Sequence, residues 1–199
     1  MDWYRYTYLA ITVIKHRLED AFATELSQYE VIGDPKDLYS AIALSKQDKY
    51  QFEWWALDLV DAIPTQDKKK GAEKEMDGYI KFFDDTSEQA KKIVIQVKSG
   101  HVNVSQIRDL IGVIEREKAA IGVFITLKEP TKNMKEEAIG VGLYVPEFFP
   151  EKRYLKLQIL TIEEILNGKK IQYFSEGTLI THKKTERKSK TKSEQISSL

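Results

Sequence analysis

The chain has 199 residues, of which 42% are hydrophobic and 31% are charged, so it can bury a core and keep a well-solvated surface. It contains no cysteine, which excludes a disulfide scaffold, a zinc ribbon and a thiol nucleophile. Basic and acidic residues number 31 each, and a net charge of zero is unusual for a protein that binds nucleic acid.

Three helices are predicted in the first 60 residues. Apolar residues recur every three to four positions over residues 9–22, which indicates an amphipathic helix. Asp34-Pro35 predicts the start of a second helix, with Asp34 as N-cap and Pro35 at the first helical position, ending near Lys46. A third helix is predicted after Asp48. Its apolar face contains Phe52, Trp55, Ala56, Leu59 and Val60.

Strands and helices alternate after Pro64. Residues 77–83 and 93–98 have the composition of strands, and residues 84–88 between them are typical of a hairpin loop. A helical stripe through residues 107–114 follows, with Ser105 as its N-cap. The remaining elements are predicted as a strand at 121–127, a helix at 131–142, a strand at 155–160 and a helix at 162–167 closed by Gly168. This order predicts a mixed α/β core.

Polar residues gather at the ends of the two strands of the hairpin. Along residues 93–98 the odd-numbered residues are all apolar and share one face, while Gln96 and Lys98 share the other. Asp77 begins the preceding strand and therefore lies beside them in the sheet. Carboxylate and amide oxygens suit a hard cation, and a neighbouring lysine can position a water for attack on phosphate.

These residues resemble those of a nuclease superfamily. Asp77-Gly78 followed by Gln96-Val97-Lys98-Ser99-Gly100 resembles the PD-(D/E)XK motif, in the Mrr-like branch where Gln replaces an acidic residue. Phe52-Glu53 matches the acidic residue often found in the preceding helix, and the strand at 121–126 ends in Thr as in that branch. The resemblance covers residues 48–146 and implies a restriction endonuclease-like αβββαβ core, a mixed sheet flanked by helices. The proline that the family has before its metal-binding Asp is Met76 here.

A second resemblance covers more of the N-terminal part. Segments near Tyr8, Lys15, Val31 and Tyr50 resemble the C-terminal extension of some bacterial site-specific DNA methyltransferases. The chain has no Asp-Pro-Pro-Tyr motif and no Gly-rich cofactor loop, so methyl transfer by this chain alone is not expected. With these resemblances, we predict a helical extension at 1–47, a nuclease-like domain at 48–175 and a basic disordered tail at 176–199.

The resemblance implies Mg²⁺-dependent hydrolysis of DNA, with Mn²⁺ as an alternative ion. Asp77, the side-chain oxygen of Gln96 and the carbonyl of Val97 would bind the metal, and Lys98 would orient or deprotonate the attacking water. Glu53 would support Lys98 or bind a second metal. Because Gln is neutral, the site is expected to hold metal more weakly than an all-carboxylate site.

Other interpretations of the same residues remain. Gln96 and Lys98 also fit the solvated side of an ordinary strand, and Glu53 also fits an exposed helical position. At the level of function, the first prediction is an endonuclease of a restriction–modification or DNA-defence system. The alternatives are a non-cleaving DNA-binding module of a methyltransferase system and a structure-specific DNA-repair nuclease.

The charges are distributed unevenly along the chain. Residues 1–62 contain 6 basic and 11 acidic residues, whereas residues 182–199 contain 6 and 2. The tail is thus expected to attract DNA without sequence preference. Phosphate contacts are also expected from basic residues near the site, namely Lys68, Lys69, Lys70, Lys91, Lys92, Arg108, Lys132 and Lys135.

The expected partners follow from this chemistry. Double-stranded DNA is the expected substrate, a methyltransferase is a candidate partner, and a homodimer would supply the two sites that cutting both strands needs. No apolar run of about 18 residues is present, so no membrane partner is expected. The N-terminus also lacks the pattern of a signal peptide, so the expected location is the cytoplasm.

Overall fold

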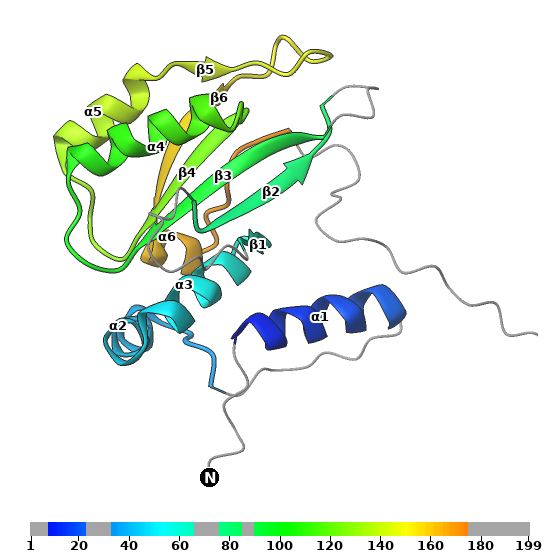
Figure 1. Cartoon of the computed structure of the whole chain (residues 1–199), viewed down its shortest axis with the longest axis vertical. Coiled ribbons are helices and arrows are strands. Elements are labelled where there is room, and N and C mark those ends of the chain that lie inside the picture. Colours follow the sequence, from blue (N-terminus) through cyan, green and yellow to red (C-terminus); the bar gives the residue numbers. More distant parts are fainter. Residues whose placement is uncertain (1–7, 23–32, 66–75, 85–89, 175–199) are drawn as a thin grey trace, which may run out of the picture.

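The computed structural model describes residues 8–22, 33–65, 76–84 and 90–174, in which three helices precede a series of strands and further helices (Figure 1). In chain order the elements are α1 (Tyr8–Phe22), α2 (Leu38–Gln47), α3 (Lys49–Asp58), β1 (Ile63–Pro64), β2 (Gly78–Phe82), β3 (Lys91–Lys98), α4 (Val104–Arg116), β4 (Ile121–Thr126), α5 (Lys132–Gly140), β5 (Leu143–Tyr144), β6 (Tyr154–Leu155), β7 (Leu157–Thr161) and α6 (Ile162–Leu166). None of the described helices is long and apolar enough to cross a membrane.

Five strands form one mixed sheet in the order β1-β2-β3-β4-β7. The first three strands pair antiparallel, whereas β3, β4 and β7 run parallel. From α3 to β4 the chain follows the order αβββαβ, so the predicted α/β class with a mixed sheet flanked by helices is confirmed. The antiparallel pairing of β2 with β3 also confirms the predicted hairpin; of its predicted loop at 84–88, residues 85–88 lie outside the described residues.

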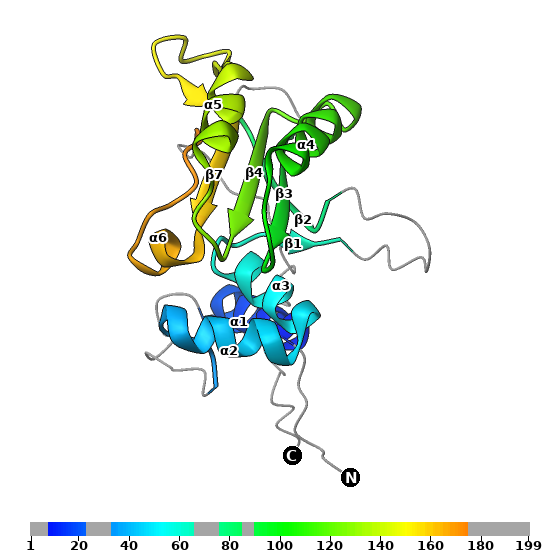
Figure 2. The same cartoon turned by 90° about the vertical axis from the view of Figure 1, so that its left-hand side faces the viewer.

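Helices cover both faces of the sheet. Helices α2, α3 and α6 pack their apolar side chains, among them Phe52 and Trp55, against one face together with Ile93, Ile95 and Val97. Helices α4 and α5 cover the other face, on which Val94 lies. Figure 2 shows α1, α2 and α3 beneath the end of the sheet toward which β4 and β7 point. The predicted alternation of faces along β3 is thus confirmed.

Two predicted helix caps are wrong. Helix α2 begins at Leu38 with Asp37 as N-cap, because the Asp37 carboxylate accepts a hydrogen bond from the Ser40 amide at 2.7 Å and the Ser40 hydroxyl accepts one from the Asp37 amide. Asp34 instead forms an ion pair with Lys15. Helix α4 is capped by Asn103 rather than Ser105, since the Asn103 side chain accepts from two amides of the first turn.

The strand predicted at 155–160 is divided in two. Its first residue belongs to β6, which pairs with β5 in a separate two-stranded sheet, and β7 begins at Leu157. Strand β7 is the last in the large sheet, and the Gln158 side chain binds the backbone of Gln172 through both its amide nitrogen at 2.6 Å and its oxygen at 2.9 Å. This contact places Gln172 beside the last strand of the large sheet.

Helix α1 is joined to the rest of the chain by a lysine with two acidic partners. The Lys15 ammonium lies 2.6 Å from Asp58 in α3 and 3.3 Å from Asp34 before α2, and all three side chains are largely buried. Burial lowers the pKa of Lys15, but the hydrogen bonds and charges of Asp58 and Asp34 outweigh it and raise that pKa. The predicted division of the chain into 1–47, 48–175 and 176–199 stays a prediction.

Candidate functional site

Asp77 lies one residue before β2 and is held against the end of β3. Its side chain is buried, with 5% of the residue exposed. Its amide donates to the Ile95 carbonyl at 2.9 Å, and its carboxylate oxygen Oδ2 accepts a hydrogen bond from the Val97 amide at 2.8 Å. Asp77 is therefore hydrogen-bonded to the β3 residues on both sides of Gln96, to Ile95 through its amide and to Val97 through its carboxylate.

The glycine after Asp77 lets α3 approach this point closely. A Cβ atom at Gly78 would lie 2.6 Å from a methyl carbon of Leu57 and 3.0 Å from the carbonyl oxygen of Ile63. Both distances are below ordinary contact, so only glycine fits here without a shift of the helix or of β1. Gly78 thereby fixes α3 beside Asp77.

Gln96 carries a buried oxygen without a partner. The residue is 8% exposed, and Oε1 has no hydrogen-bond donor among the described residues. A buried polar atom left unpaired costs about 1–3 kcal/mol, so such atoms commonly mark a place where a ligand, ion or water binds. Gln96 is the residue between Ile95 and Val97, to which Asp77 is hydrogen-bonded.

The Val97 carbonyl is directed to the same place by strand geometry. In an antiparallel strand the N–H and C=O groups of one residue point to the same side. Because the Val97 amide points to Asp77, its carbonyl also points to the β2 side. The Lys98 carbonyl points the other way and accepts a hydrogen bond from the Leu127 amide of the β4 side at 3.1 Å.

Lys98 completes this group as the last residue of β3. It is half-buried and shares the face of Gln96, two residues earlier. Its ammonium makes no hydrogen bond or ion pair with any other described residue. We call the group formed by Asp77, Gln96, Val97 and Lys98 the β2–β3 corner. The sequence predicted all four of its members as site residues.

Glu53 lies on α3, on the other side of the sheet. It is 6% exposed, so the alternative of an exposed helical position is wrong. It precedes Leu57, the residue packed against Gly78, by one helical turn, and its carboxylate lies 3.9 Å from the Lys49 ammonium. Phe52 and Trp55 of the same helix pack on the face opposite to Gln96 and Lys98. Glu53 is thus one helical turn from the residue that packs against Gly78, on the helix that covers the opposite face of the sheet.

The donors of the corner fit a hard divalent cation. A carboxylate, an unpaired amide oxygen and a backbone carbonyl are all oxygen ligands of the kind that Mg²⁺ takes. Among the described residues no three His, Cys, Asp or Glu side chains gather as a metal-binding group. A cation here would therefore depend on the neutral oxygens of Gln96 and Val97 as much as on Asp77.

Those basic residues predicted to contact phosphate that the structure describes already have acidic partners. The pairs are Lys91–Glu147 at 2.8 Å, Lys92–Glu117 at 2.8 Å, Arg108–Glu137 at 2.9 Å, Lys132–Glu136 at 3.5 Å and Lys135–Glu129 at 2.7 Å. The hydrogen bond between Arg108 and Glu137 raises the pKa of the arginine and lowers that of the carboxyl. Residues 68–70 and the tail lie outside the described residues.

Sequence reasoning missed Lys128. This exposed lysine follows β4 by two residues and has no ion-pair or hydrogen-bond partner for its ammonium in the described chain. Strand β4 ends beside β3, with Thr126 in register with Lys98. The signal available in the sequence was a lysine two residues after the Thr that ends an apolar strand.

Comparison with known proteins gives one match. A model of the family described as NACHT-associated inactive Restriction Endonuclease 1 matches residues 49–167, which is more than half of the chain. The matched segment runs from α3 through α6 and includes Glu53 and the whole β2–β3 corner. No curated protein and no solved structure matches the chain significantly.

Proposed function

The chain belongs to the NACHT-associated inactive restriction endonuclease 1 family, and we propose that, unlike the family's description, it is a Mg²⁺-dependent DNA endonuclease. It would act in a restriction–modification or DNA-defence system and use the glutamine-containing site of the Mrr-like branch. The observation that carries the proposal is the unpaired, buried Oε1 of Gln96, in the residue next to the Val97 whose amide binds the Asp77 carboxylate. Membership of a restriction endonuclease-like family supports the nuclease-type fold on which the proposal depends.

In this proposal, some residues of the corner bind the metal ion and Lys98 acts on the water and the phosphate. Asp77, Gln96 and the Val97 carbonyl would hold Mg²⁺ or Mn²⁺, and Glu53 would support Lys98 or bind a second ion. When bound, the ion supplies positive charge that lowers the pKa of a water and stabilises charge at phosphorus. Lys98, whose ammonium has no partner in the described chain, would orient the attacking water and bind the phosphate oxygens.

Plasmid cleavage tests the proposal. The full chain is incubated with supercoiled plasmid and Mg²⁺, and nicked and linear products are separated on a gel. We expect cleavage by the unmodified chain and loss of cleavage in Asp77→Asn and Lys98→Met. Lys169→Met is the matched control, because Lys169 is already paired with Glu164 at 2.6 Å. Equal cleavage by the Asp77 and Lys98 variants would overturn the assignment.

A second candidate is a DNA-binding module that does not cleave. The description of the family as inactive favours it, as does the fact that one oxygen of Asp77 is already used by the Val97 amide. Binding of duplex DNA without cutting, over a panel of DNA sequences and of the ions Mg²⁺ and Mn²⁺, is the result expected from this candidate. Such a module could serve a methyltransferase partner, whereas a cleaving enzyme would need two copies to cut both strands.

A further inference from the structure

We propose that Lys128 binds a DNA phosphate next to the one at Lys98, and that Thr126 is the residue that positions it. This inference rests on the proposed function, because it takes duplex DNA as the substrate of the β2–β3 corner. Four observations support it, namely the backbone connection between β3 and β4, the hydroxyl bonds of Thr126, the pairing of Glu129 and the exposure of Lys128.

The turn that carries Lys128 is fixed to the strand that carries Lys98. Thr126 is in register with Lys98, and the amide of Leu127 donates to the Lys98 carbonyl at 3.1 Å. Neighbouring strands lie about 4.8 Å apart. The end of β4 is therefore about one strand spacing from the end of β3, so an extended Lys128 side chain and the Lys98 side chain can reach neighbouring phosphates of one DNA strand.

The buried hydroxyl of Thr126 determines the direction in which the chain leaves β4. Its oxygen donates to the Lys128 carbonyl at 2.9 Å and accepts from the Lys128 amide at 3.1 Å. Thr126 is fully buried, so solvent does not compete for these bonds. Both polar groups of the Lys128 backbone are thus held by one side chain, and the lysine begins from a defined point.

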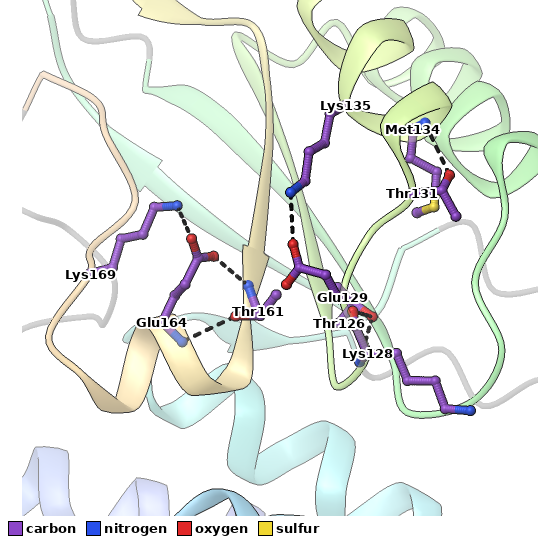
Figure 3. A network of polar contacts seen from close by, with 9 residues as sticks. All are labelled: Thr126, Lys128, Glu129, Thr131, Met134, Lys135, Thr161, Glu164 and Lys169. Atoms are coloured by element: carbon purple, nitrogen blue, oxygen red, sulfur yellow. Dashed lines mark hydrogen bonds and ion pairs between the residues drawn. The ribbon is translucent and has the colours of Figure 1, made fainter.

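The charges around this turn leave Lys128 available for an anion. The neighbouring carboxylate of Glu129 is bound to Lys135 at 2.7 Å, and Figure 3 shows Lys128 directed away from that pair. Lys128 is exposed, and its ammonium has no partner among the described residues. The five predicted basic residues that the structure describes would have to give up an acidic partner to bind phosphate, whereas Lys128 would not.

Binding of a labelled DNA duplex of about 20 base pairs in EDTA, where no cleavage occurs, tests the proposal through its salt dependence. Each phosphate contact contributes about −0.9 to the slope of log affinity against log salt. Lys128→Gln should reduce the slope by about one, so that between 50 and 200 mM salt its affinity falls about 3.5-fold less than that of the unmodified chain. The reduction should be the same for unrelated DNA sequences.

Variants of Thr126 test its positioning role. Thr126→Val should reduce the slope and, in Mg²⁺, raise KM for plasmid with little change in kcat. Thr126→Ser keeps the hydroxyl and should restore both values. Lys128→Arg should keep the slope, and Lys169→Gln, which removes a paired lysine at the same end of the sheet, should leave it unchanged.

The outcomes separate this inference from the proposed function. If the unmodified chain binds and cuts DNA but Lys128→Gln keeps the full slope, the role of Lys128 is wrong and the endonuclease proposal stands. If the unmodified chain does not bind the duplex at any salt concentration, both are wrong. If Thr126→Val changes kcat rather than KM, Thr126 does not act through Lys128.

Discussion

Two groups of polar side chains lie at the same end of the sheet and differ in whether their polar groups have partners within the described chain. Figure 3 shows the group at the ends of β4 and β7, which we call the β4–β7 network: Glu129, Lys135, Thr161, Glu164 and Lys169. Each charge in it has a partner, at 2.7 Å for Lys135–Glu129 and 2.6 Å for Lys169–Glu164. In the β2–β3 corner the Gln96 oxygen and the Lys98 ammonium have no partner in the described chain.

The difference is the one expected between a structural cluster and the proposed metal site. In the network, the Glu164 carboxylate also accepts a hydrogen bond from the Thr161 amide at 2.9 Å, and the Thr161 hydroxyl accepts one from the Glu164 amide. These two reciprocal bonds form the capping box of α6. Such exposed pairs contribute at most about 1 kcal/mol each. In the corner, the Gln96 oxygen is left unpaired among the described residues, which costs stability and which a bound ion or water would offset.

The largest expected difference between the two groups is in catalysis. Lys98→Met should reduce plasmid cleavage at least about 100-fold, since the residue would stabilise charge on the reacting phosphate. Lys169→Met should stay within about twofold, because its charge is already neutralised. Initial rates of supercoiled plasmid loss measure both. A comparable loss in the two variants would show that the pairing of a lysine does not distinguish their roles.

Gly78→Ala should disturb the corner by moving the helix beside it. The added Cβ would meet the backbone oxygen of Ile63 at 3.0 Å as well as the Leu57 side chain, and the backbone cannot move aside easily. We expect a loss of about 3 kcal/mol in the free energy of unfolding, measured by urea denaturation. Gly112→Ala is the matched control, because a Cβ there has no atom within 4 Å. Equal stability of the two variants would contradict the close approach of α3.

Lys15→Met should weaken the attachment of α1 by about 2 kcal/mol at neutral pH, because it leaves two largely buried carboxylates without a cation. The pKa of Lys15 is raised in the folded chain, so its contribution is complete below the unfolded pKa of about 10.4 and decreases as pH rises through the folded value. Urea denaturation of both chains at pH 8 and pH 11 measures this. An unchanged difference at pH 11 would exclude the charge as its cause.

The smallest effects should have opposite signs in the two groups. Gln96→Met removes the unpaired oxygen at similar volume and should stabilise the chain by about 1 kcal/mol. Glu164→Gln should destabilise it by less than about 1 kcal/mol. Burial raises the pKa of Glu164, but the bonds to Lys169 and Thr161 outweigh it and lower that pKa, so this loss should disappear as pH falls below about 4. Destabilisation by Gln96→Met would show that its oxygen is satisfied.

The parts that were predictable from the sequence depend on local patterns. The alternation along β3 placed Gln96 and Lys98 on one face, and the hairpin placed Asp77 beside them, because both follow from strand geometry. Local patterns were less successful where two capping residues compete. Asp34-Pro35 is a good helix start by composition, but Asp37 forms the reciprocal bonds with Ser40.

Pairing between distant residues could not be predicted. Lys91 and Glu147 are 56 positions apart and Arg108 and Glu137 are 29 apart, so nothing in the local sequence shows that these cations are neutralised. In the same way, the Lys128 ammonium has no acidic partner in the described chain because its neighbour Glu129 is paired with Lys135, six positions later. Burial of Glu53 likewise depends on how α3 packs on the sheet.

Mg²⁺ binding tests the central claim, that the β2–β3 corner is a metal site, most directly. Isothermal titration of the full chain with MgCl₂ should give one binding event. Asp77→Asn should abolish it, Gln96→Glu should tighten it by adding a charge, and Glu164→Gln should leave it unchanged. Absence of binding in the unmodified chain, or equal binding in Asp77→Asn, would contradict the account.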